Sequence, residues 1–164
     1  MNRTKMIVFG ALMAALAAII QSLPALLTEA VIFITIFSSI PIYIIARIKP
    51  TVGVLSYLVA AFLVMLISLH EALFFLFSNG VVGLSLGSCS YFMIRKLLLA
   101  VLSALMLTLS LCIINYGIGI MVFGSELPGA LIVQIIIIFV FSCIYVSVYH
   151  IFADFIYRRF KIIT

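Results

Sequence analysis

Long apolar runs follow one another along the chain, and the short breaks between them fall at charged residues, Pro and Gly. A helix needs about 20 apolar residues to cross a bilayer hydrocarbon core of roughly 30 Å. Most of the runs approach or exceed this length and carry almost no charge. The pattern predicts six membrane-spanning helices, over about residues 6–22, 30–48, 51–69, 72–94, 97–123 and 130–157.

Composition supports this interpretation, because 68% of the 164 residues are hydrophobic and only 8% are charged. A soluble domain of this length cannot bury so much apolar surface. The first segment has the basic start and small-residue end of a signal peptide. However, the topology described below, with all basic residues on one side of the membrane, requires this segment to be retained as the first span. We therefore expect an all-α integral membrane protein, with a single transmembrane domain over residues 1–164 built as a compact bundle of six transmembrane helices.

The basic residues define the predicted topology. They precede the first span, lie between spans two and three and between spans four and five, and follow span six. They are Arg3, Lys5, Arg47, Lys49, Arg95, Lys96, Arg158, Arg159 and Lys161. Lys and Arg concentrate in cytoplasmic loops, so we expect both termini in the cytoplasm of a bacterial cell. Each of the three outer loops then carries one carboxylate, from Glu29, Glu71 or Glu126, although acids also populate such loops simply because Lys and Arg are excluded.

Polar residues inside the spans are the candidates for function, because a polar group in hydrocarbon must face protein or a cavity. His70 and Glu71 form the predicted turn between spans three and four. Asn79 lies roughly 12 Å further along the helix and borders a glycine-rich face. Asn79 is expected either to line a cavity or to form an interhelical hydrogen bond.

Other polar groups gather in the outer halves of spans four, five and six. Together they predict one outward-facing pocket, in which a few polar groups among apolar walls orient a small molecule. The candidate substrate-binding residues are His70, Glu71, Asn79, Asn115, Tyr116, Glu126, Gln134 and Tyr145. Three outer carboxylates and few outer cations favour a neutral or amine-bearing substrate over an anion.

Chemistry of other kinds is not indicated. His150 and Asp154 lie four residues apart and can share a helix face. They are expected either to form a proton relay or to make a hydrogen bond at headgroup level or contacts with Arg158. No nucleophile, base and orienting group occur at a usable spacing, so we do not expect an enzyme. The three cysteines fall in apolar segments without metal or disulfide spacing, and neither a cofactor nor a metal ion is expected.

Two features concern helix packing. On the first span, Gly10, Ala14, Ala17, Ala18 and Gln21 share one face, which is suited to close packing within the chain or against a partner. In span two, Pro41 removes a backbone donor and predicts a kink. Hydroxyl groups of Ser38 and Ser39 are available for the carbonyl groups that the kink frees.

Several segments resemble the substrate-binding S components of energy-coupling factor (ECF) vitamin importers. They are the alanine-rich GALMAALAAII, the SSIPIYIIARIKPTVGVLSYLVAAFL segment and the glycine-rich SNGVVGLSLG, within six short spans. The resemblance implies that a first-helix A-x-x-x-A motif contacts a transmembrane coupling subunit, and the matching pairs are Ala11 with Ala15 or Ala14 with Ala18. It also implies cytoplasmic ATPase subunits and a ligand site in the outer half.

The leading hypothesis is therefore a membrane-embedded subunit that captures a vitamin or related small molecule from outside and relies on a separate ATPase module. A scaffold subunit of a bacterial membrane assembly, resembling the rod-shape-determining membrane proteins, is one alternative. A gradient-driven carrier that uses His150 and Asp154 is another. No nucleic-acid partner is indicated.

Overall fold

The structure, a computed structural model, describes residues 3–27, 29–92, 95–120, 122 and 128–163. Every element in these ranges is helical. The elements are α1 (Arg3–Leu26), η1 (Glu29–Ser38), α2 (Ser39–Ile48), α3 (Pro50–Met65), α4 (Leu69–Phe74), η2 (Phe75–Asn79), α5 (Gly80–Phe92), α6 (Lys96–Cys112), η3 (Ile113–Ile118) and α7 (Leu131–Ile163). The segment η1 is a 3₁₀ helix, whereas η2 and η3 are π-helical.

The all-helical fold with six helices is confirmed, because η1 continues into α2, α4 continues through η2 into α5, and α6 continues into η3. Five of these helices are long and apolar enough to cross a membrane. The exception is α3, which has 16 residues and ends at Met65. The predicted third span reached residue 69, so its boundary was wrong.

The turn between α3 and α4 also differs from the prediction. It occupies residues 66–68, and His70 and Glu71 belong to the first turn of α4. The Ser68 side chain accepts a hydrogen bond from the Glu71 backbone N–H at 3.4 Å, which is the usual role of a serine before a helix. At the end of η3, Gly119 has φ +80°, so the fifth helix stops at Ile118 rather than near residue 123.

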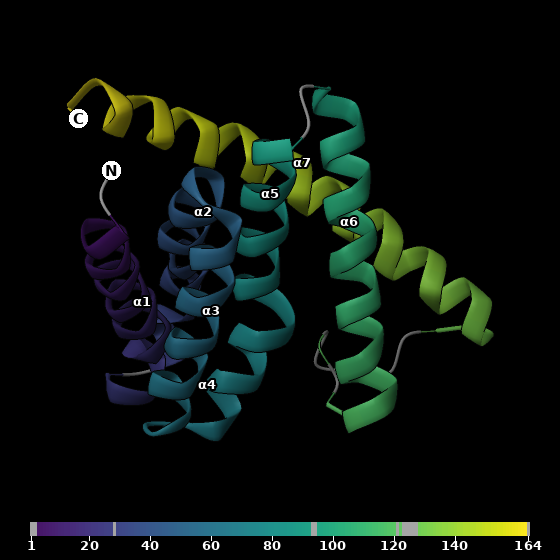
Figure 1. The fold of residues 1–164 in the computed structure, drawn as a ribbon. Coiled ribbons are helices and arrows are strands. Elements are labelled where there is room, and N and C mark those ends of the chain that lie inside the picture. Colours follow the sequence, from purple (N-terminus) through teal and green to yellow (C-terminus); the bar gives the residue numbers. More distant parts are fainter. Residues whose placement is uncertain (1–2, 28, 93–94, 121, 123–127, 164) are drawn as a thin grey trace.

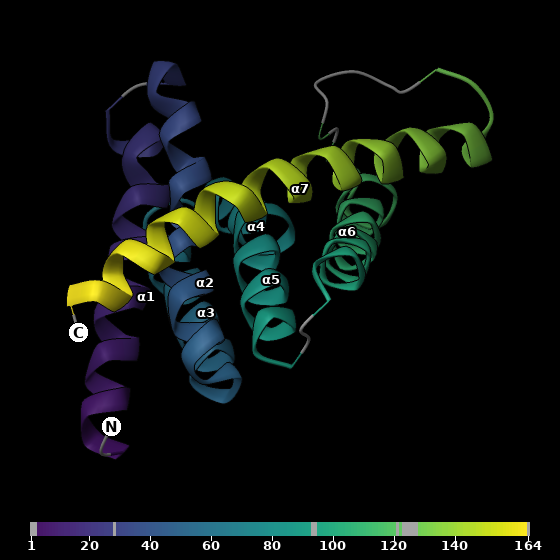
Figure 2. The same cartoon turned by 90° about the horizontal axis from the view of Figure 1, so that it is seen from above.

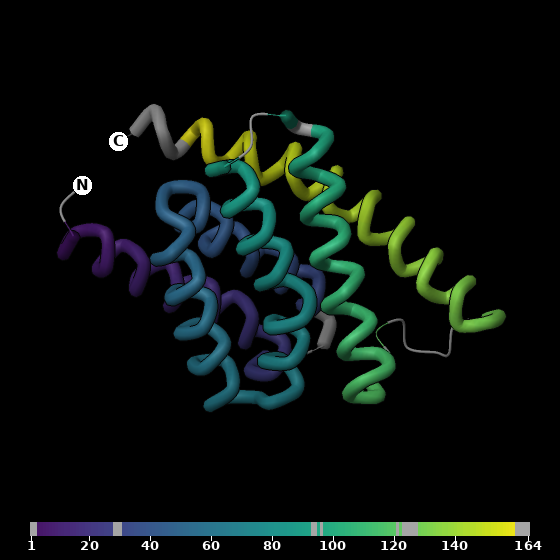
Figure 3. The backbone as a smooth tube through the Cα atoms, turned by 45° about the vertical axis from the view of Figure 1, so that its right-hand side comes forward, coloured from purple at the N-terminus to yellow at the C-terminus, as the bar shows by residue number. Residues whose placement is uncertain are grey.

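The helices α1 to α5 run alongside one another, with α6 at one side (Figure 1). The start of α1, the end of α2 and the end of α7 lie at one end of the bundle, and α4 lies at the other (Figures 1 and 3). The predicted grouping of basic residues at one end agrees with this path of the chain. Which side of a membrane this end faces stays a prediction.

The last helix departs from a simple bundle, because α7 crosses the other helices obliquely (Figure 2). It packs mainly on α6 and makes smaller contacts with α2 and α5. Its 33 residues correspond to about 50 Å, far more than a hydrocarbon core of roughly 30 Å. A strong tilt is the ordinary way for such a helix to keep its apolar length within a bilayer.

The closest packing joins α2 to α5. A Cβ atom added to Gly87 would lie 2.6 Å from the Cβ atom of Ala46 and 2.7 Å from the carbonyl oxygen of Tyr43. Small residues at helix interfaces let two backbones approach, and in lipid this packing is a main source of association. The glycines of α5 therefore allow α2 to pack in close contact.

We expect Gly87→Ala to destabilise the protein by about 1–3 kcal/mol, because the added methyl group meets backbone that cannot yield easily. Thermal unfolding in detergent should show a fall of several degrees in Tm. Gly117→Ala is the matched control, since the nearest atom to its added Cβ lies 3.8 Å away and alanine favours a helix. An equal Tm for the two variants would contradict the proposed close packing.

Candidate ligand pocket

Polar side chains from several segments meet inside the end of the bundle that contains α4. Gln21 comes from α1, Ser38 from η1, Glu71 from α4 and Asn79 from η2. Gln21 and Asn79 are only 1% and 7% exposed. Buried polar groups need partners, and these residues supply them to one another.

Gln21 is the centre of the network. Its Nε2 donates to Glu71 Oε2 at 2.8 Å, and its Oε1 accepts from Ser38 Oγ at 2.9 Å and from Asn79 Nδ2 at 3.1 Å. One amide thus connects α1 to η1, α4 and η2. The prediction that Asn79 either lines a cavity or bonds to another helix is confirmed in both forms, because Asn79 also lines the pocket described below.

Asn79 extends the network in two directions. Its Nδ2 also donates to the backbone carbonyl oxygen of Thr35 at 3.1 Å. Its Oδ1 lies 3.5 Å from the hydroxyl of Tyr145 on α7, a long hydrogen bond. The long α7 helix therefore touches the network through one side chain.

The helices are irregular where the network forms. The 3₁₀ helix η1 has 10 residues, although such helices usually end after three or four, and η2 is a π-helical turn of the kind often found at functional sites. Pro41 lies in the first turn of α2, so the predicted kink takes the form of a change from 3₁₀ to α-helix. The Ser39 hydroxyl donates to the carbonyl oxygen of Ile36 at 2.7 Å as expected, whereas the Ser38 hydroxyl donates to the side chain of Gln21.

A pocket of about 190 Å³ opens beside the network. Side chains of α1, η1, α4 and η2 form its walls. They are Gln21, Ile32, Thr35, His70, Glu71, Phe74, Ser78 and Asn79. The pocket combines apolar walls with a carboxylate, an imidazole, two amides and two hydroxyl groups, which suits a small molecule that carries polar atoms.

The candidate residues divide into two groups. Glu71, His70 and Asn79 line this pocket, and Tyr145 reaches Asn79 from α7. Asn115, Tyr116 and Gln134 do not line it, and the Tyr116 hydroxyl instead donates to Gln134 Oε1 at 2.7 Å. The expectation that all of them face this one pocket is therefore wrong for these three. Glu126 lies outside the described residues.

Six residues of the pocket and its network were not among the candidates, namely Gln21, Ile32, Thr35, Ser38, Phe74 and Ser78. The sequence pattern pointed to Gln21 only as part of the small-residue face of α1, and to Ser38 only as a possible partner of the carbonyl groups freed by Pro41. No feature of the sequence pointed to Thr35. The polar amide at the end of an otherwise small-residue stripe was the clue to Gln21, since a buried glutamine needs several partners. The partners themselves lie 17 to 58 residues away in sequence.

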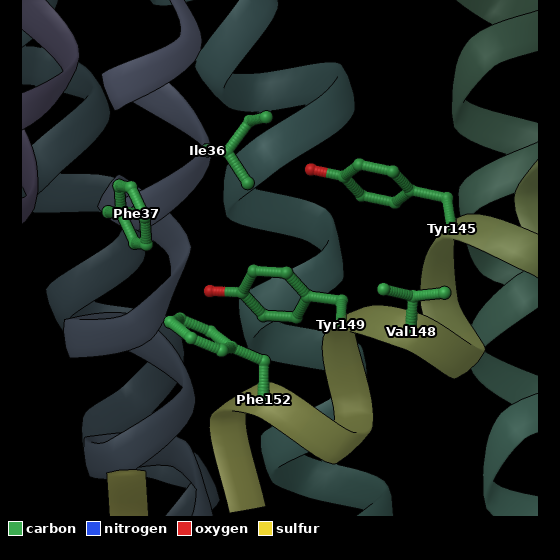
Figure 4. A pocket seen from close by; sticks show the side chains of 6 residues that line it. All are labelled: Ile36, Phe37, Tyr145, Val148, Tyr149 and Phe152. Atoms are coloured by element: carbon green, nitrogen blue, oxygen red, sulfur yellow. The ribbon is translucent and has the colours of Figure 1, made fainter. Parts of the chain in front are cut away.

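An apolar groove of about 300 Å³ lies between η1 and α7. Its lining residues are Ile36, Phe37, Tyr145, Val148, Tyr149 and Phe152 (Figure 4). The rings of Tyr145 and Tyr149 stack with their centroids 6.1 Å apart, and both side chains extend from α7 toward η1. The ring centroids of Phe37 and Phe152 lie 5.7 Å apart, and this contact joins the two walls of the groove. The surface inside it is carbon, so this groove suits lipid or another apolar group.

Asp154 has a different setting from Glu71. Asp154 Oδ1 accepts from Arg47 of α2 at 2.6 Å, and Oδ2 accepts from Arg158 at 2.9 Å. The Arg47 guanidinium also donates to the hydroxyl of Tyr43 and lies 4.1 Å from the ring centre of Tyr157. The predicted contact of Asp154 with Arg158 is confirmed, and this cluster ties the end of α7 to α2.

The predicted docking face on α1 is largely used within the chain. Ala14 and Ala18 are 0% and 5% exposed and pack in clusters with residues of α3, as the alternative of internal packing predicted. Ala11 is exposed and Ala15 half-buried, so a partner contact there stays a prediction.

No protein-family model, curated protein or solved structure matches the chain.

We expect the two acids to respond differently to neutralisation. Asp154→Asn should destabilise the protein by about 1–3 kcal/mol, because two arginines lose their carboxylate in a partly buried site. Glu71→Gln should change stability by less than about 0.5 kcal/mol, since an amide oxygen can still accept from Gln21. Thermal unfolding without added ligand measures both. A larger loss for Glu71→Gln would show that its carboxylate has a structural role.

Proposed function

We propose that the chain is the membrane-embedded substrate-binding subunit of an ECF-type importer in a bacterial cell membrane. In this role it captures a vitamin or related small molecule from outside. A transmembrane coupling subunit and cytoplasmic ATPase subunits then supply the energy for transport. The single observation that carries the proposal is the polar pocket around Gln21, Glu71 and Asn79, at the end of the bundle opposite the ends that carry the basic residues.

The construction of the pocket supports ligand binding over simple packing. A side chain that served only to join helices would be satisfied by one hydrogen bond and close contact. Here the network borders an open volume, and its Glu71 carboxylate and His70 face that volume. Two irregular helical segments, η1 and η2, shape the walls.

The alternatives have less support in the described residues. A carrier that uses Asp154 as a proton relay requires this carboxylate to release its partners, and it is held by two arginines. A scaffold subunit does not require a pocket lined by a carboxylate. Neither alternative accounts for the arrangement around Gln21.

Native mass spectrometry of the protein purified gently from its own membrane tests the proposal. We expect a bound small molecule, and a coupling subunit with ATPases should co-purify. The Asn79→Ala variant should lose the small molecule, because it removes hydrogen bonds that fix the pocket wall.

The Asn115→Ala variant is the matched control and should retain the molecule, since Asn115 does not line the pocket. Cell-wall machinery in place of the coupling subunit would favour a scaffold. Protein that carries no small molecule and is stabilised by none from a vitamin and precursor panel would contradict the proposal.

A further inference from the structure

The Glu71 carboxylate lacks a positive partner in the described part of the chain. The ion pairs there both belong to Asp154. Glu71 Oε2 accepts from Gln21, and among the described residues none donates a hydrogen bond to the other oxygen. In the part of the chain that the structure describes, no Lys or Arg lines the pocket. A carboxylate that is partly removed from water favours a nearby cation, so the pocket has a charge that a ligand can complement.

The other walls define what surrounds such a cation. The hydroxyl oxygens of Thr35 and Ser78 line the same pocket and can accept hydrogen bonds. Ile32 and Phe74 are the apolar walls, and the His70 ring lies against Phe74 with centroids 4.8 Å apart. An ammonium group with several N–H donors has acceptors here, and an aromatic face is also favourable for a cation.

The volume limits the size of the ligand. Pockets for larger ligands measure roughly 300–1,000 Å³, whereas a cavity of about 150 Å³ is enough for benzene. The pocket beside Glu71 measures about 190 Å³. It therefore accepts one ring or an apolar group of that size together with a polar end, and a fused multi-ring compound does not fit inside it.

We propose that this pocket selects a small organic ammonium ion, whose nitrogen binds the free Glu71 oxygen and whose apolar part, about the size of one ring, packs on Ile32 and Phe74. The proposal rests on the proposed function and names its substrate class. It excludes anions, because a carboxylate ligand would meet Glu71 without a compensating cation.

Four probes separate the contributions of charge and size. They are benzylamine, benzyl alcohol, benzoate and methylamine, added at neutral pH to the full chain in detergent. A thiol-reactive fluorophore reports unfolding, since Cys89, Cys112 and Cys143 are half-buried in the folded protein. We expect benzylamine to bind about tenfold or more tightly than benzyl alcohol, because the alcohol can still donate a hydrogen bond to Glu71 but lacks the positive charge that pairs with the carboxylate. Methylamine should bind weakly and benzoate should not stabilise the protein.

The Glu71→Gln variant should bind benzylamine and benzyl alcohol about equally, because it preserves the shape of the pocket and removes its charge. Asp154→Asn is the matched acid-to-amide control. It should lower the Tm and still bind benzylamine about tenfold or more tightly than benzyl alcohol, since Asp154 does not line the pocket.

Failure of this inference can be distinguished from failure of the proposed function. Equal binding of benzylamine and benzyl alcohol to the unmodified protein, binding of benzoate, or no stabilisation by benzylamine would overturn the ammonium inference. A preference that survives Glu71→Gln would overturn it too. The native small molecule and the coupling subunit would still be found by mass spectrometry in those cases if the proposed function holds.

Discussion

A buried polar group must find its partners within the protein, and the side-chain amide of Gln21 meets this requirement for several helices at once. Its oxygen accepts from Ser38 and Asn79, and its nitrogen donates to Glu71. The small residues of α1 bring the helix close enough to η1 and α3 for this amide to reach its partners. The location of the pocket follows from this network, since three of these side chains are also its walls.

The irregular segments follow from the same requirement. A regular helix through residues 29–48 would need a backbone donor at Pro41, which has none. The chain instead forms the 3₁₀ helix η1, and hydroxyl groups of Thr35 and Ser39 bond carbonyl oxygens three residues earlier. On the facing helix, the π-helical turn η2 ends at Asn79, whose amide bonds the Thr35 carbonyl oxygen. The two departures from α-helix therefore meet at a hydrogen bond between them.

Sequence alone predicted the helices well and the site only in part. Apolar length and charge are local properties, so the six helices and the grouping of their basic ends could be predicted. The small face of α1 was visible, but its use for internal packing of Ala14 and Ala18 depends on where α3 lies. Asn115, Tyr116 and Gln134 have the same polar character as Asn79. Only the oblique course of α7 and the position of the end of α6 decide that they lie outside the pocket.

The same reasoning explains the different roles of Glu71 and Asp154. Both are partly removed from water, and a charge in that position requires compensation. Asp154 receives it from Arg47 and Arg158, and the resulting cluster joins α7 to α2. Within the described ranges, the Glu71 carboxylate receives one amide hydrogen bond, which orients it without neutralising it. A carboxylate that is held in place, borders a pocket and keeps its charge uncompensated is suited to binding a cation, whereas the compensated Asp154 is suited to holding two helices together.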